Sequence, residues 1–242
     1  MNHKLAFIHF GKAGGSYINF YLRKKIKIDE INSWHPNSLI TCEAGNWKRD
    51  WTEKELLEIS NFEPTSPTVV HNHHNNWTAK AVHEFNSKEW LTFMFIRDPR
   101  DIICSLYFYA HRLINDDKPT PLGPVGALAG HLPPGTFIAP DVTKLNLDKF
   151  VYDLATNDQL KIFWKLPSFT GSISYVREMS DENFGKFCKD ILNFEYFPIN
   201  HINTTQNKGY KYYLNSGEIS SNTYQVLIDT PEFNEYKEYL IL

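Results

Sequence analysis

The chain has 242 residues, which is enough for one large domain or two small ones. With 25 basic and 28 acidic residues the formal net charge is −3, so the sequence lacks the positive excess that nucleic-acid binding requires. The three cysteines, Cys42, Cys104 and Cys188, are far apart and odd in number, which favours reduced thiols over a disulfide framework. No stretch approaches the ~20 apolar residues of a membrane helix, so we expect no transmembrane segment and a cytoplasmic protein.

The hydrophobic pattern predicts strands and helices in alternation, which is typical of an α/β protein with a parallel sheet flanked by helices. The expected strands cover residues 4–10, 68–71, 90–96 and 173–176. The expected helices cover residues 16–26, 99–114, 147–156 and 181–192, with two more starting near the Thr52/Glu55 capping box and near Thr78.

The segment from about 115 to 146 breaks this pattern, because it holds six prolines and four glycines in 32 residues. Long loops of this kind in compact domains are usually functional or disordered. We therefore predict a single domain over residues 1–242 that carries this segment as a loop insertion.

A glycine-rich turn, Gly11-Lys12-Ala13-Gly14-Gly15-Ser16, joins the first strand to the first helix. Backbone amides and a helix N-terminus at such a turn can bind an anion, to which Lys12 would add a full charge. An ordinary glycine-rich turn with Ser16 as the helix N-cap is the alternative. The loop departs from that of nucleoside triphosphatases, because its lysine precedes the glycine pair and no hydroxyl residue follows the lysine directly.

A second polar group follows the buried strand 90–96, at the strand end where ligands of open α/β sheets bind. Arg97 offers a fork of donors suited to phosphate, and Ser105 lies about two turns into the following helix. The alternative is structural: Arg97 would pair with Asp98 or Asp101, and Ser105 would be a small packing residue.

The segments IHFGKAGGSYI (8–18) and FIRDPRDIICSLYFY (95–109) together resemble the two cofactor loops of the sulfotransferase family, which uses 3′-phosphoadenosine 5′-phosphosulfate (PAPS). The resemblance implies a P-loop-like sulfotransferase fold. It also implies that the loop from Gly11 to Ser16 (Gly11, Lys12, Ala13, Gly14, Gly15, Ser16) holds the 5′-phosphosulfate. Arg97 and Ser105 would hold the 3′-phosphate.

Weaker resemblance extends further along the chain. Residues 175–179 (YVREM) and the next helix are similar to a later strand and helix of the family, but Val176 replaces the tyrosine that stacks on adenine, with Tyr175 adjacent. The segment 201–209 is similar to the loop that closes over the 3′-phosphate, where Lys208 is the implied ligand.

Histidines follow the strand at residues 68–71, where the family carries its catalytic base. Aligning strand ends places His73 at the base position and His71 where some relatives have a lysine; on a strand these two share a face and His74 points away. An imidazole can accept a hydroxyl proton at neutral pH. Zinc binding by His71 and His73 and a merely polar surface role are the alternatives.

These patterns predict transfer of a sulfuryl group from PAPS to a hydroxyl or amine of a small-molecule, lipid or carbohydrate acceptor, releasing 3′,5′-adenosine bisphosphate. His73, or failing it His71, would be the base, Lys12 would neutralise charge on the leaving group, and no metal would be needed. The alternatives are a P-loop kinase-like nucleotide-binding enzyme and a non-catalytic nucleotide-binding module. Neither the acceptor nor the oligomeric state follows from the sequence.

Overall fold

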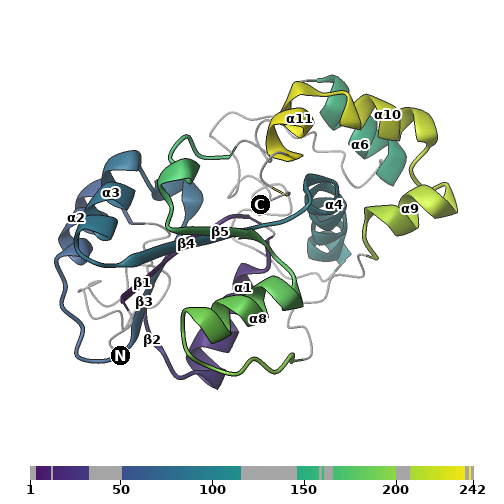
Figure 1. Ribbon diagram of the computed structural model, residues 1–242. Coiled ribbons are helices and arrows are strands. Elements are labelled where there is room, and N and C mark those ends of the chain that lie inside the picture. Colours follow the sequence, from purple (N-terminus) through teal and green to yellow (C-terminus); the bar gives the residue numbers. More distant parts are fainter. Residues whose placement is uncertain are drawn as a thin grey trace. The chain divides into compact units, whose positions relative to one another are not determined.

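The computed structural model describes residues 4–11, 13–32, 51–115, 146–157, 160, 166–199, 208–237 and 240 (Figure 1). Lys12, Cys42 and most of the proline-rich segment lie outside these ranges. The chain divides into two compact units. Unit 1 comprises Met1–Ile96, Pro167–Ile202 and Leu242, and unit 2 comprises Arg97–Leu166 and Asn203–Ile241. The single-domain organisation expected from the sequence stays a prediction.

Unit 1 is built on a five-stranded sheet with the order β2-β3-β1-β4-β5, in which every neighbouring pair is parallel. The strands are β1 (Lys4–His9), β2 (Asp29–Asn32), β3 (Thr68–His73), β4 (Leu91–Ile96) and β5 (Tyr175–Glu178). The α/β class with a parallel sheet flanked by helices is thereby confirmed. Strand β2 was not predicted, because its four residues, Asp-Glu-Ile-Asn, carry no apolar run. Strand β5 begins two residues later than expected.

Helices cover both faces of this sheet (Figure 1). The helical segments of unit 1 are α1 (Gly15–Phe20), η1 (Tyr21–Lys25), α2 (Glu53–Ser60), η2 (His74–Asn76), α3 (Ala79–Ser87), η3 (Thr170–Ser172) and α8 (Asp181–Asp190). The predicted capping box starts α2: the Thr52 side chain accepts from the Glu55 amide, and Glu55 accepts from the Thr52 amide. The expected first helix is α1 continued by one π-helical turn, η1, which the periodicity did not predict.

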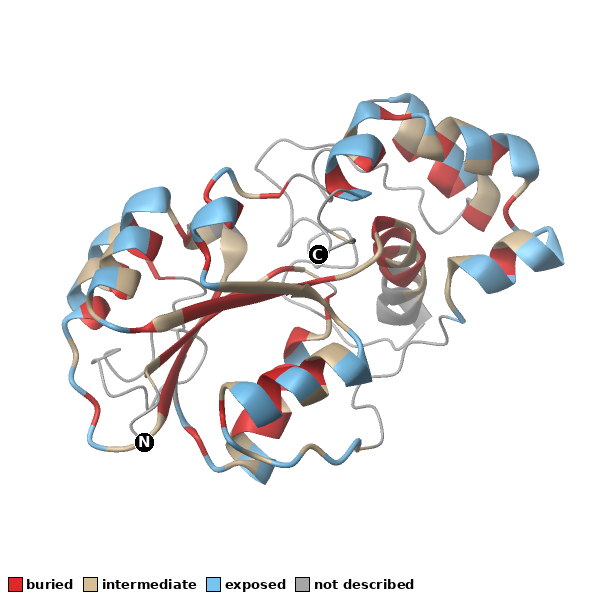
Figure 2. Cartoon of the chain, viewed as in Figure 1, coloured by how far each residue is buried: buried red, intermediate tan, exposed pale blue. Residues whose placement is uncertain are grey.

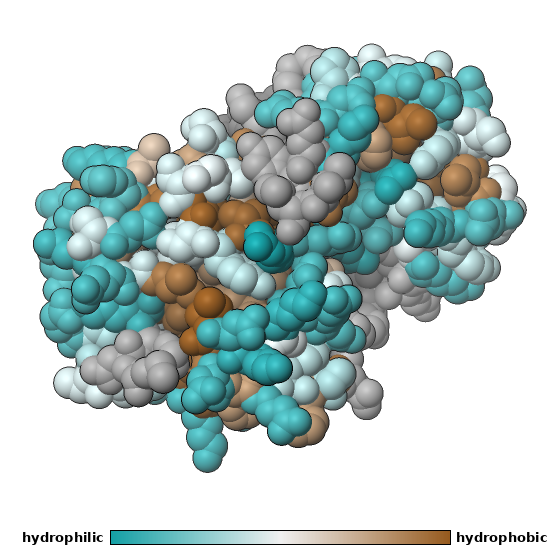
Figure 3. Space-filling model, viewed as in Figure 1, coloured by the Kyte–Doolittle hydropathy of each residue, from teal (hydrophilic) through white to brown (hydrophobic). Residues whose placement is uncertain are grey.

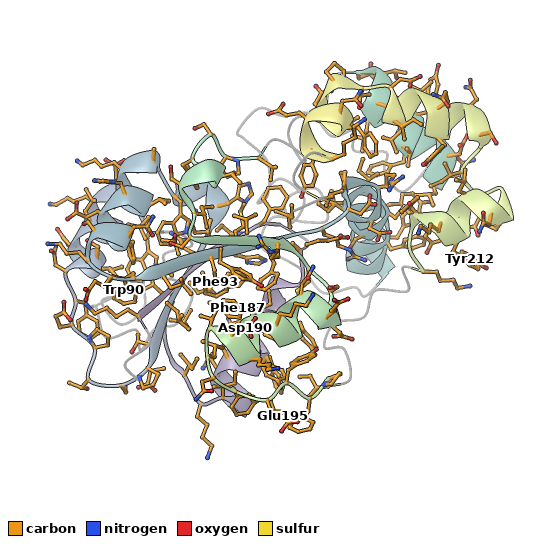
Figure 4. All side chains as sticks on the ribbon, viewed as in Figure 1. Trp90, Phe93, Phe187, Asp190, Glu195 and Tyr212 are labelled. Carbon is orange, nitrogen blue, oxygen red and sulfur yellow. The ribbon has the colours of Figure 1, made fainter. Side chains whose placement is uncertain are left out.

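The central strands are buried on both faces because each face receives a layer of helices (Figure 2). On one face, Phe93 of β4 meets Phe187 of α8 with ring centroids 4.7 Å apart (Figure 4). On the other face, Trp90 packs edge-on against Phe85 of α3 and donates from Nε1 to the carbonyl of Ser60 in α2. Aromatic rings therefore fill the space between the sheet and both helical layers.

Unit 2 is helical in its described part: α4 (Pro99–Asn115), α6 (Leu147–Thr156), α9 (Tyr210–Ser216), α10 (Ser221–Ile228) and α11 (Pro231–Lys237). The predicted helices 99–114 and 147–156 are confirmed as α4 and α6. The three C-terminal helices were not predicted, since each has only seven or eight residues and little periodicity to read. Helix α6 contacts α10, and Asp148 accepts a 2.7 Å hydrogen bond from the amide of Ser220.

Hydrophilic side chains cover most of the surface drawn in colour in Figure 3, and apolar ones occur there in small groups. Among the described residues, no helix combines the length and apolarity needed to cross a bilayer. Cys104 and Cys188 are buried free thiols, and burial raises the pKa of each to about 12. Two of the three expected reduced cysteines thus lie in apolar surroundings, and Cys42 is outside the described residues.

Candidate functional site at the carboxyl ends of β1 and β3

The order of the sheet places a topological switch point between β1 and β3. These strands are neighbours, yet the chain leaves β1 into α1 on the α8 side of the sheet and leaves β3 into α3 on the opposite side (Figure 1). In open parallel sheets, ligands bind outside the carboxyl ends of the strands at such a point. The glycine loop follows β1 here. The expected strand 68–71 extends to His73, so the predicted base is the last residue of β3 and lies in register with His9.

Two positions of the glycine loop, Gly14 and Gly15, favour glycine. Gly14 is the N-cap of α1 and adopts a left-handed conformation with φ 79°, where a Cβ would also meet Met179 at 3.0 Å. At Gly15 a Cβ would come within 2.0 Å of the His9 ring. A side chain is therefore excluded at both positions, whereas a Cβ at Gly11 would meet nothing within 4 Å.

Among the described residues, no side chain caps the start of α1. Ser16 is the second residue of this helix and is exposed, so the alternative in which Ser16 is the N-cap is wrong. The first amides of a helix lack acceptors from a preceding turn. Here the Tyr17 amide donates to the carbonyl of Gly14, and no side chain of the described residues accepts from the amides of Gly15 and Ser16 before it. The loop from Gly11 to Ser16 thus offers donors to an anion; Ala13 is buried beneath it, and Lys12 lies outside the described residues.

His71 uses both of its ring nitrogens within the protein. The side-chain amide of Asn19 in α1 donates from Nδ2 to Nδ1 of His71 at 3.1 Å. A neutral ring that accepts at Nδ1 carries its proton on Nε2, and this nitrogen lies 3.2 Å from Nδ1 of His9. His71 therefore donates to His9, and Asn19, His71 and His9 form a chain of hydrogen bonds.

His73 contacts the same ring from another side: its imidazole stacks on His9 with centroids 4.5 Å apart and planes at 24°. Its backbone amide donates to Oδ1 of Asn72, a buried residue on the opposite face of the strand. The expectation that His71 and His73 share one face of β3 is confirmed, because both meet His9.

His74 belongs to a different environment at the start of η2. Its Nδ1 donates to the carbonyl of His9 at 3.3 Å, and its ring packs against Phe10 at 4.6 Å. Burial lowers the pKa of His74 to about 4, so the ring is neutral at physiological pH. His71, His73 and His74 are all half-buried and in ring contact, so a merely exposed polar role does not describe them.

The zinc alternative finds no support in this arrangement. Within the ranges that the structure describes, no group of three or more His, Cys, Asp or Glu side chains is placed to hold a metal ion. The nitrogens through which His71 could bind metal are those it shares with Asn19 and His9.

The second predicted group lies in unit 2, around the start of α4. Arg97 has a side chain 34% exposed, and with described residues it forms one long ion pair, Nε to Oδ2 of Asp101 at 3.8 Å. The other oxygen of Asp101 accepts a 2.8 Å hydrogen bond from the amide of Tyr210. Lys208 lies two residues before Tyr210, so Asp101 connects the two residues expected at the 3′-phosphate.

Lys208 is exposed and contacts α9, the helix that begins two residues after it. Its ammonium donates to the hydroxyl of Tyr212 at 3.0 Å and lies over that ring, and its backbone amide donates to the hydroxyl of Tyr213. The hydrogen bond with Tyr212 raises the pKa of Lys208, so the cation persists. Ser105, in contrast, is 6% exposed within α4, which fits the packing alternative at least as well as a ligand role.

Of the two structural partners considered for Arg97, Asp101 forms the long ion pair described above, whereas Asp98 pairs with Arg100. Arg100 donates from Nε and Nη2 to the two oxygens of Asp98 at 2.9 and 2.6 Å, and from Nη1 to the hydroxyl of Tyr224. Its guanidinium lies 3.9 Å from the centre of the Tyr210 ring. The Asp98 side chain is thus used by Arg100, and among the described residues Arg97 has its long contact with Asp101.

The later segment with the weaker resemblance forms β5 and α8, and there Tyr175 is half-buried against the core of unit 1. Its ring packs on Phe95 and Phe187, and its hydroxyl donates to the carbonyl of Asn183. Burial raises its pKa. The ring that adjoins Val176 is thus engaged with Phe95 and Phe187.

Two residues of the site were missed by sequence reasoning: His9 and Asn19. A signal for His9 was present in β1: side chains alternate along a strand, so residues 5, 7 and 9 point to one face of the sheet. In the structure, His71 and His73 of the neighbouring strand point to this same face. For Asn19 the signal was weaker: it lies one helical turn after Gly15, on the helix that starts at the loop.

Comparisons with protein-family models, with curated proteins and with solved structures found no match to this chain.

Proposed function

We propose that this protein is a sulfotransferase that moves a sulfuryl group from PAPS to a hydroxyl or amine of a small-molecule, lipid or carbohydrate acceptor. The observation that carries the proposal is the meeting of a glycine loop and three histidines at the switch point between β1 and β3. A loop that can bind an anion and a ring that can accept a proton are the two parts that such a transfer needs.

Each of the two units supplies donors that suit one part of PAPS. The uncapped start of α1 offers amides to the phosphosulfate, and Lys12 would add a charge that neutralises the leaving group. Arg97 and Lys208 would bind the 3′-phosphate, because each is a cation with donors to spare in its described contacts, and Ser105 is the weakest member of this set. When bound, PAPS supplies the sulfuryl group itself.

The alignment of strand ends makes His73 the better candidate for the base. His71 has both nitrogens in hydrogen bonds with Asn19 and His9, so it could accept a proton only by giving one of them up. His74 has a pKa of about 4 and is directed at a backbone carbonyl, which makes it a poor proton acceptor. His73 would take the proton of the acceptor as the sulfuryl group is transferred in line.

Calorimetric titration tests the cofactor class. The protein should bind 3′,5′-adenosine bisphosphate without magnesium, and more tightly than adenosine 5′-monophosphate or NAD. Binding of ATP with magnesium in preference to the bisphosphate would replace the proposal by a kinase-like function. Radiolabelled PAPS offered with a panel of glycans, phenols, alkyl alcohols and amines then tests turnover, and tight bisphosphate binding with no labelled product from any acceptor would favour a binding module.

A further inference from the structure

His9 connects the glycine loop after β1 to the histidines of β3. Its ring lies against the Cα of Gly15 so closely that no Cβ fits there. Its Nδ1 accepts the hydrogen bond from His71 at 3.2 Å, and its ring face stacks on His73. Phe7, two residues earlier on the same face of β1, stacks on both His9 and His71. The ring of His9 is therefore held from several sides at once.

We propose that His9 is a positioning residue, which fixes the ring of His73 by stacking and the proton of His71 by a hydrogen bond, both relative to the glycine loop. His9 would not touch the reacting atoms. This role in catalysis rests on the proposed function, in which the loop binds PAPS and His73 takes the proton of the acceptor. The positioning is a property of ring contacts, so it can be measured without any activity.

The two contacts of His9 differ chemically and can be removed one at a time. His9→Phe keeps an aromatic ring for His73 and Gly15 but has no acceptor for the Nε2–H of His71. His9→Asn keeps a polar atom near the place of Nδ1 but has no ring to stack on His73. If His9 only filled space, His9→Phe would leave the rings of both His71 and His73 as they are. Positioning predicts that His9→Phe disturbs His71 alone and that His9→Asn disturbs His73.

Nitrogen-15 and proton spectra of the histidine rings provide the readout. In the wild-type protein, His71 should be the neutral tautomer with its proton on Nε2, and a scalar coupling across the hydrogen bond should join this nitrogen to Nδ1 of His9. In His9→Phe this coupling is lost and the signals of His71 move while those of His73 stay near their wild-type values. In His9→Asn the ring protons of His73 shift downfield, because the shielding by the stacked ring is gone.

His83→Phe and His83→Asn are matched controls, because His83 is exposed on α3 and these changes should leave the signals of His71 and His73 in place. If a His9 variant fails to fold, the wild-type coupling still decides: a proton on Nδ1 of His71 would overturn the inference. Equal spectra for wild type, His9→Phe and His9→Asn would overturn it too. Failure of the wild-type protein to bind 3′,5′-adenosine bisphosphate would count against the proposed function and would leave the measured positioning intact.

Discussion

Asp101 divides its carboxylate between two tasks: one oxygen accepts the 2.8 Å hydrogen bond from the amide of Tyr210, and the other lies 3.8 Å from Arg97. The first contact joins the start of α9 to α4. Glycine at position 209 leaves room for it, since a Cβ there would lie 3.2 Å from the same carboxylate oxygen. The second contact is too long for a hydrogen bond. An anion that binds to Arg97 would therefore displace little.

Arg97→Ala should weaken the preference of the protein for 3′,5′-adenosine bisphosphate over adenosine 5′-monophosphate by about 10-fold to 100-fold. Hydrogen bonds to a charged group contribute about 1.5–3 kcal/mol, and the second ligand lacks the phosphate that would receive them. Isothermal titration with both ligands measures the ratio. An unchanged ratio would mean that the 3′-phosphate binds elsewhere.

Arg100→Ala is the control for this variant. Removing Arg100 leaves the Asp98 carboxylate, whose side chain is 14% exposed, without its bidentate partner. Breaking a buried pair in this way costs about 3–5 kcal/mol, so the free energy of unfolding should fall markedly. Arg97→Ala should change it by less than about 1 kcal/mol, because long and exposed ion pairs contribute little.

Gly15→Ala should lower the free energy of unfolding by about 1–3 kcal/mol, the usual cost of adding a group to a filled site. The added Cβ would collide with His9, so the change should also weaken bisphosphate binding. Chemical denaturation measures the first effect and titration the second. Gly11→Ala should do neither, since its Cβ would meet nothing within 4 Å. His9→Ala in the Gly15→Ala background should recover part of the lost stability; no recovery would contradict the collision.

Lys12→Ala should lower turnover of PAPS by about 10² to 10³, as the loss of one donor to a developing charge commonly does. Binding of 3′,5′-adenosine bisphosphate should suffer less, because the product lacks the sulfuryl group. Initial rates with labelled PAPS and the best acceptor of the panel provide the measurement, and Lys80→Ala, an exposed position on α3, is the control. Near-normal turnover would rule out the assignment of this loop to the phosphosulfate.

His73→Ala should bind 3′,5′-adenosine bisphosphate like the wild-type protein and lose about 10² to 10⁴ in turnover, the usual contribution of a general base. His71→Ala should lose less turnover but more stability, because Asn19 and His9 would both lose a partner. The two variants are compared by initial rates and by denaturation. The reverse order of turnover losses would make His71 the base.

His74 should make the folded protein sensitive to acid. Its pKa falls from 6.5 to about 4 on folding, so below pH 6.5 the unfolded chain takes up a proton that the folded chain refuses. Stability should therefore fall as the pH drops from about 6.5 to about 4, by up to about 3 kcal/mol at 1.36 kcal/mol per pKa unit. Denaturation curves measured across this range test the slope.

The variant His74→Asn keeps a donor for the carbonyl of His9 and removes the titration, so its stability should depend less on pH. His83→Asn, which changes an exposed histidine, should keep the wild-type slope. Identical slopes for wild type and His74→Asn would show that other groups cause the acid sensitivity.

The sequence by itself determined those features that arise from neighbouring residues. Apolar runs predicted β1 and β4, the Thr52/Glu55 pair predicted the start of α2, and Asp98-Pro99 predicted the start of α4. Periodicity placed His71 and His73 on one face of β3. Each of these follows from backbone geometry and local hydrogen bonding within a few residues of the chain.

Tertiary structure alone decided which side chains meet. The bond between His71 and His9 joins residues 62 positions apart, and the contact of Arg100 with Tyr224 joins residues 124 positions apart. The sequence offered both Asp98 and Asp101 as structural partners of Arg97. In the folded chain Asp98 instead pairs with Arg100, whose guanidinium also contacts Tyr210 of α9 and Tyr224 of α10. The local sequence pattern determines the direction in which a side chain leaves its strand or helix. The partner that the side chain meets depends on how distant segments pack, and this packing is determined by burial of apolar surface throughout the unit.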